Sequence, residues 1–217
     1  MLKALLWDND GVLVDTETLY YQANRTSLAK LGIDLTAEIY RKVSLNEGHS
    51  VLDLARSAGL NDQGIRALRE QRNKKYIQLL KKSELLISGA LDTLNHFMGR
   101  LKMALVTSSY REYIDIIEGK TGYLHFFNTV ITRDIYQRSK PDPEPYLLAL
   151  DALKIKPEES LVIEDTLRGL NAATAGGIPC LVIPNSFNRV QSFPGALKVL
   201  SDITRVIPFL ESNGFGI

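Results

Sequence analysis

Short apolar runs recur along the chain at intervals that leave room for helices, and this spacing limits the fold more than any other feature. Most of the runs are rich in leucine, valine or isoleucine, as strands buried on both faces of a sheet should be. Helical patterns separate the later runs, and such alternation is typical of a parallel sheet with helices on both faces. We therefore predict an α/β fold with strands at residues 2–7, 101–106, 129–132, 160–163 and 179–183.

Residues 8–100 separate the first two predicted strands, whereas a simple crossover between parallel strands needs about a dozen residues. The intervening sequence reads as successive helices, among them ETLYYQANRTSLAKLG, SVLDLARSAGL and DQGIRALREQRNKKYIQLLKK. We interpret residues 16–85 as a helical domain inserted after the first strand, with residues 1–15 and 86–217 forming the core. The alternative is that the extra helices pack on the sheet as part of one domain.

Composition limits the partners of the chain. The net charge is +1, so no global field attracts nucleic acid or an anionic membrane. No segment is apolar over the length of a membrane span, and the first residues lack the apolar core of a secretion signal. The single cysteine, Cys180, excludes an intramolecular disulfide and fits a reducing compartment. We expect a cytoplasmic protein, monomeric or weakly oligomeric, that binds neither nucleic acid nor membrane.

Polar residues of a few kinds follow the predicted strands. In open parallel sheets the active crevice lies at the carboxyl ends of the strands, so residues at these positions are candidates for a site. Carboxylates, hydroxyls and one ammonium group gather there: Asp8 and Asp10 after the first strand, Thr107 and Ser108 after the second, Lys140 beyond the third, and Glu164 and Asp165 after the fourth.

This set of groups fits phosphoryl transfer assisted by Mg²⁺. Several carboxylates without clustered histidine or cysteine favour a hard cation with oxygen ligands, which would lie between Asp8 and Asp165 and relieve their repulsion. Asp8 is the predicted nucleophile and would form an aspartyl-phosphate, while Asp10 would act as general acid and base. Three groups would hold the phosphate oxygens: Lys140, Thr107 and the backbone N–H of Ser108.

The ordered segments resemble the haloacid dehalogenase superfamily, in its branch of β-phosphoglucomutase-like and phosphoglycolate-phosphatase-like hydrolases with a helical cap. WDNDGVLVDTE resembles the first family motif, LVTSS the second, SKPDPEPY the lysine motif and VIEDTLRGLNAATAGG the fourth. The resemblance implies a Rossmann-like core, a mobile cap at residues 16–85 that excludes water, Asp8 as nucleophile and Asp10 as acid and base. It also implies Mg²⁺ ligation by Asp8, the main-chain carbonyl of Asp10 and Asp165, with Glu164 acting through water.

Two departures from the β-phosphoglucomutase pattern concern the substrate. Tyr20 stands where those enzymes carry a histidine, and Tyr110-Arg111 stands where they carry a Lys-Asn pair. The loop from Asn46 to Ser50 lies where the family contacts its substrate. We therefore predict substrate contacts from Asn46 and His49, and a contact from Arg111 to a second anionic group.

The predicted function is that of a phosphoric monoester hydrolase, a Mg²⁺-dependent phosphatase for a small phosphorylated metabolite. A phosphomutase is the alternative within the same family; a bisphosphate would activate it, and it would release little inorganic phosphate. A signalling receiver domain is the alternative from another class, since it also surrounds an aspartyl-phosphate with carboxylates, a threonine and a lysine. Receivers are much shorter and lack a large helical insertion. The sequence does not name the substrate.

Overall fold

Six parallel strands form one sheet in the computed structural model, which describes residues 1–215. The strand order is β3-β2-β1-β4-β5-β6, so the first strand lies inside the sheet, where Trp7 is in register with Leu105 on one side and Ile163 on the other. The α/β fold with a parallel sheet is confirmed. The strands are β1 (Ala4–Trp7), β2 (Lys102–Val106), β3 (Thr129–Ile131), β4 (Ser160–Glu164), β5 (Cys180–Val182) and the unpredicted, two-residue β6 (Lys198–Val199).

Helices cover both faces of the sheet, which explains why β1 is apolar throughout. Leu5 and Trp7 point to one face and pack in a cluster with residues of α4, α5 and α8. Ala4 and Leu6 point to the other face and pack against α6 and α7. The core helices are α4 (Ala90–Phe97), α5 (Arg111–Thr121), α6 (Glu144–Leu153), α7 (Leu167–Ala175) and α8 (Val206–Ser212), with short turns η3 (Tyr123–Phe126), η4 (Pro157–Glu159) and η5 (Ile203–Arg205).

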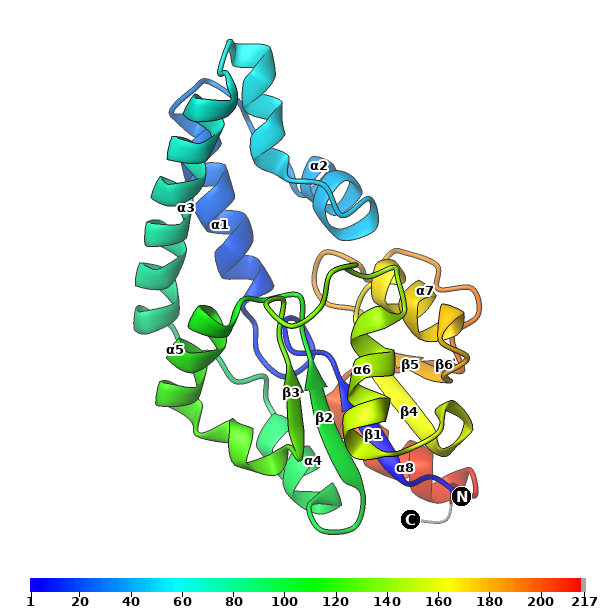
Figure 1. The fold of residues 1–217 in the computed structure, drawn as a ribbon. Helices are drawn as coiled ribbons and strands as arrows, with labels where there is room; N and C mark the ends of the chain where they lie inside the picture. The colour runs from blue at the N-terminus through cyan, green and yellow to red at the C-terminus, as the bar shows by residue number, and fades with distance from the viewer. Residues whose placement is uncertain (216–217) are drawn as a thin grey trace.

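A helical module stands above the carboxyl ends of the strands (Figure 1). It has its own hydrophobic cluster, which includes Leu28, Tyr40 and Leu52. The segment expected as a second helix is a 3₁₀ helix, and a π-helical turn precedes it. The module comprises α1 (Glu17–Ala29), α2 (Ala37–Tyr40), η1 (Arg41–Asn46), η2 (Val51–Ala58) and α3 (Asp62–Lys82).

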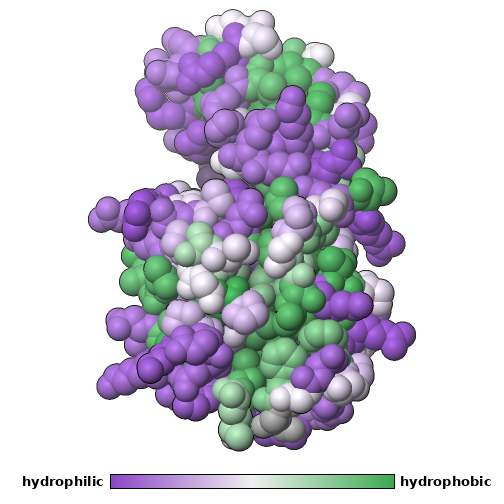
Figure 2. Space-filling model, turned by 90° about the vertical axis from the view of Figure 1, so that its right-hand side faces the viewer, coloured by the Kyte–Doolittle hydropathy of each residue, from purple (hydrophilic) through white to green (hydrophobic). Residues whose placement is uncertain are grey.

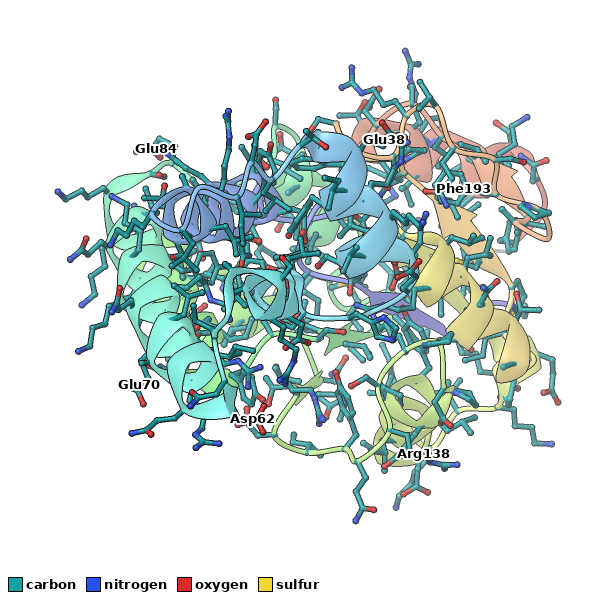
Figure 3. The ribbon with its side chains drawn as sticks, turned by 90° about the horizontal axis from the view of Figure 1, so that it is seen from above. Glu38, Asp62, Glu70, Glu84, Arg138 and Phe193 are labelled. Carbon is teal, nitrogen blue, oxygen red and sulfur yellow. The ribbon has the colours of Figure 1, made fainter. Side chains whose placement is uncertain are left out.

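The module has a largely hydrophilic outer surface and is separated from the core by a constriction (Figure 2). Seen from above, Glu70 and Glu84 lie at its outer rim (Figure 3). Within residues 1–215, no helix has both the length and the apolar character needed to cross a membrane.

Two adjacent chain segments connect the module to the core. The N–H of Asp15 donates to the carbonyl of Leu85 at 2.8 Å, and the N–H of Ile87 donates to the carbonyl of Leu13 at 2.9 Å. The outgoing and returning segments therefore pair with each other at the base of the module. This pairing and the separate hydrophobic cluster support our proposal that residues 16–85 are a distinct domain.

Aromatic side chains form further contacts between the module and the core. Phe187, in the loop after β5, lies with its ring centroid 5.2 Å from that of Tyr21 and 5.3 Å from that of Tyr40. On the opposite side, Tyr76 of α3 lies 5.1 Å from Tyr113 of α5 in an edge-to-face arrangement. These pairs hold the module close to the strand ends.

Candidate active site

Lys140 lies at the centre of a buried charged cluster. Its Nζ donates to Asp8 Oδ1 at 2.6 Å, to Glu164 Oε1 at 2.8 Å and to the carbonyl oxygen of Val106 at 2.9 Å. Its ammonium also lies 4.7 Å from the ring centroid of Tyr146. The lysine thereby joins the ends of β1, β2 and β4, which carry Asp8, Val106 and Glu164.

Glu164 is surrounded by hydrogen-bond donors. Besides Lys140, the hydroxyl of Tyr146 donates to Oε1 at 2.7 Å. Oε2 accepts from the backbone N–H groups of Asp165 and Thr166 and from the Thr166 hydroxyl. A Cβ on Gly169, in the first turn of α7, would collide with this carboxylate, so the site requires a glycine there. Glu164 therefore serves to position the lysine and the following loop.

Three carboxylates lie close enough to hold a cation: oxygens of Asp8, Glu164 and Asp165 are within 4.8 Å of one another. Lys140 occupies Oδ1 of Asp8, and Asn185 donates to Oδ2 of Asp165 at 2.5 Å. Among residues 1–215, none donates a hydrogen bond to the other oxygen of either aspartate. These two oxygens suit a hard divalent cation, whereas both oxygens of Glu164 already accept hydrogen bonds.

The side chain of Asp10 points away from this group of carboxylates. Its Oδ2 accepts hydrogen bonds from Thr107 Oγ1 at 2.9 Å and Ser109 Oγ at 3.0 Å, and its Oδ1 accepts from the hydroxyl of Thr16. Thr16 immediately precedes α1, so Asp10 is linked to the base of the module. Gly11 has φ +89°, and a Cβ there would collide with Asp165, which explains the glycine at this turn.

Burial and mutual repulsion govern the ionisation of these groups. Burial raises the pKa of Asp8, with Lys140 opposing the rise, and burial together with Glu164 and Asp8 raises the pKa of Asp165. Burial also disfavours the ionised form of Glu164, but the adjacent Lys140 prevails and lowers the pKa of that carboxyl. A cation beside Asp8 and Asp165 would favour their ionised forms.

A cleft of about 510 Å³ lies between the module and this cluster. Of the predicted site residues, the cleft is lined by Asp8, Asp10, Ser108, Lys140, Glu164 and Asp165, while Thr107 lies directly beneath, bonded to Asp10. His49 also lines it, with a side chain that is 73% exposed. Asn46 and Arg111 do not: Asn46 accepts from Gln191, and Arg111 pairs with Asp115 at 2.7 Å.

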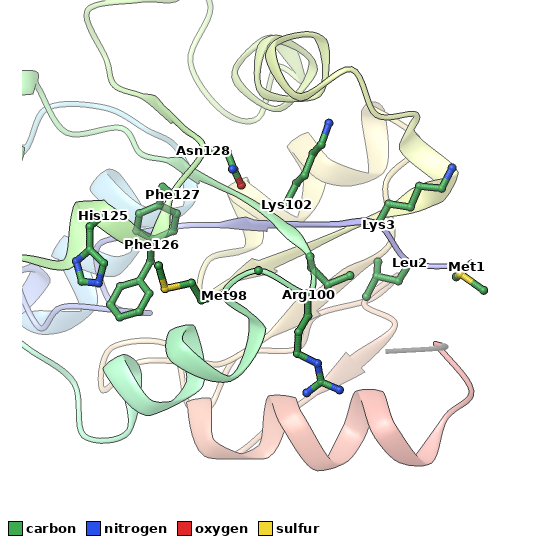
Figure 4. A pocket seen from close by; sticks show the side chains of 12 residues that line it. Met1, Leu2, Lys3, Met98, Arg100, Lys102, His125, Phe126, Phe127 and Asn128 are labelled. Atoms are coloured by element: carbon green, nitrogen blue, oxygen red, sulfur yellow. The ribbon is translucent and has the colours of Figure 1, made fainter.

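A second hollow, of about 610 Å³, lies at the opposite, amino-terminal end of the strands (Figure 4). Lys3, Arg100, Lys102, His125 and Asn128 line it together with apolar side chains, and no carboxylate does. Without carboxylates it does not offer the oxygen ligands that a hard cation needs, so the first cleft is the candidate active site.

Several residues of the site were not predicted from the sequence. Asn185 follows β5 as Asp8 follows β1, so the strand-end rule could have identified it. Tyr146 belongs to the lysine motif SKPDPEPY, but nothing in the sequence assigns it to the site. Arg72 of α3 lines the cleft from within a run of charged residues that resembles a solvated helix face.

Comparison with known families identifies the chain. The family model for haloacid dehalogenase-like hydrolases matches residues 5–183, which include every core residue of the cluster except Asn185. The chain belongs to this family. The resemblance inferred from the motifs is therefore confirmed, and so is the predicted enzyme class, a phosphoric monoester hydrolase.

Three similar proteins narrow the comparison within this family. It is 30% identical to a phosphorylated carbohydrates phosphatase of Thermotoga maritima over 82% of each chain. It is 26% identical to protein CbbY of Cereibacter sphaeroides, over 95% of this chain and 94% of that protein. The crystal structure of a CbbY mutant from Rhodobacter sphaeroides in complex with xylulose-(1,5)bisphosphate is similar with a TM-score of 0.79 at 25% identity, over 94% and 95% of the two chains.

Proposed function

We propose that this hydrolase is a Mg²⁺-dependent phosphatase that acts on a small phosphorylated carbohydrate through an aspartyl-phosphate on Asp8. The observation that carries the proposal is the buried cluster of Asp8, Lys140, Glu164 and Asp165 beneath the cleft. The activity named for the Thermotoga relative and the sugar bisphosphate bound to the CbbY mutant support a sugar phosphate as the substrate.

The carboxylates fit a magnesium site. Asp8 and Asp165 each have an oxygen without a donor among residues 1–215, and burial makes their charges costly unless a cation lies nearby. We assign these two side chains and the main-chain carbonyl of Asp10 as ligands, with Glu164 acting through water. When bound, Mg²⁺ would neutralise charge on the carboxylates and on the substrate phosphate.

Asp8 and Asp10 have different roles in the first half-reaction. A carboxylate oxygen of Asp8 attacks phosphorus, and the bond from phosphorus to the sugar oxygen breaks. The Asp10 carboxyl gives its proton to the departing oxygen. Lys140 contributes positive charge beside the phosphate, and the Ser108 backbone N–H donates a hydrogen bond to its oxygens. Thr107 would join them when its hydroxyl turns from Asp10 to the phosphate.

The second half-reaction reverses the role of Asp10. Its carboxylate takes a proton from a water molecule, whose oxygen attacks phosphorus while the bond to Asp8 breaks. Inorganic phosphate leaves, and both aspartates return to their starting states. The helical module acts as a cap that limits entry of other water.

The residues at which the chain departs from the β-phosphoglucomutase pattern do not support the phosphomutase alternative. Tyr20 packs beneath Arg72, and Arg111 is paired with Asp115 outside the cleft. Family membership argues against the receiver domain. Hydrolysis is therefore the reaction we propose.

Replacement of the nucleophile tests this function. We expect Asp8→Asn to reduce phosphate release from sugar phosphates at least about 1,000-fold, because the amide cannot attack phosphorus. Asp15→Asn is the matched control, since Asp15 is exposed in the same segment and does not line the cleft. We also expect a chelator to abolish wild-type activity and added Mg²⁺ to restore it. Full activity of Asp8→Asn would exclude the proposed nucleophile.

A further inference from the structure

The loop at residues 185–188, shortly after β5, contacts the carboxylate cluster and the helical module at the same time. Asn185 Nδ2 donates to Oδ2 of Asp165 at 2.5 Å. Asn188 Nδ2 donates to the main-chain carbonyl of the same aspartate at 3.2 Å. Phe187, between the two asparagines, contacts aromatic rings of the module. One short loop therefore joins Asp165 to the module.

Hydrogen bonds within the loop fix its shape. Asn185 Oδ1 accepts from the N–H of Phe187 at 2.8 Å, and the main-chain carbonyl of Asn185 accepts from the N–H of Asn188 at 3.1 Å. Asparagine often fixes a turn in this way, by bonding the backbone two residues further on. Both ends of the Asn185 amide are therefore engaged: its oxygen holds the backbone of Phe187, and its nitrogen holds Asp165.

The Phe187 ring packs into the hydrophobic cluster of the module. Its centroid lies 5.2 Å from that of Tyr21 and 5.3 Å from that of Tyr40, and these two centroids lie 5.1 Å apart, so the three rings form a triangle. Among residues 1–215, Phe187 is the only apolar side chain from outside residues 16–85 that packs against this cluster. The module cannot move away from the core without breaking these aromatic contacts.

The bond from Asn185 orients a carboxylate that we assign to the cation. It engages Oδ2 of Asp165 and thereby fixes the rotation of the carboxylate, so the other oxygen is already placed when a cation arrives. Partners that orient a metal ligand in this way strengthen binding, and their removal typically lowers metal affinity by about 10–100-fold. Any movement that loosens Asn185 should therefore weaken the cation site.

We propose that Asn185 is a positioning residue for Asp165 and that the 185–188 loop couples cation binding to closure of the helical module. The inference rests on the proposed function, because it takes Asp165 as a ligand of Mg²⁺. Such coupling acts in both directions. The contact of Phe187 with Tyr21 and Tyr40 favours cation binding, and the cation favours that contact. The cap then closes preferentially over a loaded site.

Cation affinity in the absence of substrate tests the first direction. In calorimetric titrations with Mg²⁺ we expect Asn185→Ala to bind at least about tenfold more weakly than the wild type, because Asp165 loses its donor. Phe187→Ala should bind about fivefold more weakly, although its side chain does not contact the carboxylates. Phe187→Leu, which keeps an apolar side chain, should retain part of the affinity.

Val190→Ala is the matched control, because Val190 is exposed close to the loop and does not line the cleft. It should bind Mg²⁺ as the wild type does. Asn185 is only half-buried, so its replacement leaves the packing of the core intact. Wild-type affinity in Asn185→Ala would overturn the positioning role, and wild-type affinity in Phe187→Ala would overturn the coupling.

Hydrogen exchange followed by mass spectrometry tests the second direction. In the wild type we expect saturating Mg²⁺ to slow exchange about fivefold in peptides that contain Tyr40, because the cation favours the closed module. Asn185→Ala, also saturated with Mg²⁺, should not show this slowing. Equal slowing in the two proteins would contradict the coupling.

The titration also separates this inference from the proposed function. A wild type that binds no Mg²⁺ would overturn the assigned metal site and, with it, the coupling. A wild type that binds Mg²⁺ with an affinity shared by Asn185→Ala and Phe187→Ala would overturn the present inference alone.

Discussion

The two ends of the cleft each bury one cation, and they compensate its charge in opposite ways. At the core end Lys140 contacts two carboxylates and a backbone carbonyl. At the cap end Arg72 contacts only neutral groups. The core cation is already paired without a ligand, so Lys140 can keep the nucleophile in place between turnovers. The cap cation lacks a counter-charge, so a ligand can supply it. The comparison suggests that the chemistry is built into the core, whereas substrate choice belongs to the cap.

Removal of the core cation should give the largest effect. In Lys140→Met, Asp8 and Glu164 would remain buried without the ammonium between them. We expect phosphate release to fall about 1,000-fold and the free energy of unfolding to fall by about 3 kcal/mol. Phosphate assays and denaturant titration would measure both, with the exposed Lys198→Met as control. If Lys140→Met kept wild-type activity and stability, Lys140 would not have the role assigned to it at the core end of the cleft.

Loss of an aromatic contact between core and cap should give a smaller effect. Phe187→Ala would separate the loop after β5 from Tyr21 and Tyr40 of the module. We expect a loss of about 2 kcal/mol in the free energy of unfolding and a KM raised several-fold, because the closed cleft would be less populated. Val190→Ala, in an exposed part of the same loop, should change neither quantity. Unchanged KM in Phe187→Ala would show that this contact does not hold the cap.

The third effect is confined to a limited pH range and concerns Glu17, which lies between the two ends. Burial, with a contribution from Asp10, raises the pKa of Glu17 from 4.5 to about 7, although a hydrogen bond from Tyr40 opposes the rise. Between these pH values the folded protein retains a proton that the unfolded chain has lost. Stability from this group is therefore fully present below pH 4.5 and declines as the pH rises to about 7.

Glu17→Gln should lack this part of the pH dependence. With a chelator present in both samples, we expect wild-type unfolding free energy to fall by about 2 kcal/mol more than that of the variant across this window. Parallel curves for the two proteins in urea titrations would contradict the raised pKa.

Sequence reasoning succeeded where one local rule was enough. Apolar runs marked the five longer strands. The rule that sites follow parallel strands singled out Asp8, Lys140 and Asp165, which lie together in the structure. The two-residue β6 was missed because so short a strand leaves no pattern. The same rule predicted that Asp10 belongs to this group, yet its side chain points toward Thr16 and away from the other carboxylates.

The cap was less predictable because its contacts join distant parts of the sequence. Arg72 sits among charged residues, and its burial, its position over the Tyr20 ring and its hydrogen bond to Asn24, 48 positions earlier, distinguish it from its exposed neighbours. The structure places His49 beside the cleft, whereas Arg111 lies outside it and pairs with Asp115 on the next turn of α5. The contact of Arg72 with Asn24 depends on how the helices pack, which propensity and spacing do not determine, whereas the i,i+4 spacing of Arg111 and Asp115 could have indicated their pairing.

The central claim is that Asp8 carries the phosphoryl group during turnover. Intact-mass spectrometry and peptide mapping of Asp10→Ala, mixed with p-nitrophenyl phosphate and Mg²⁺, test it most directly. This activated leaving group needs no proton from Asp10, whereas hydrolysis of the intermediate still needs a base. We predict that a phosphoryl adduct accumulates on Asp8. Wild-type turnover with no adduct, or an adduct on another residue, would contradict the account.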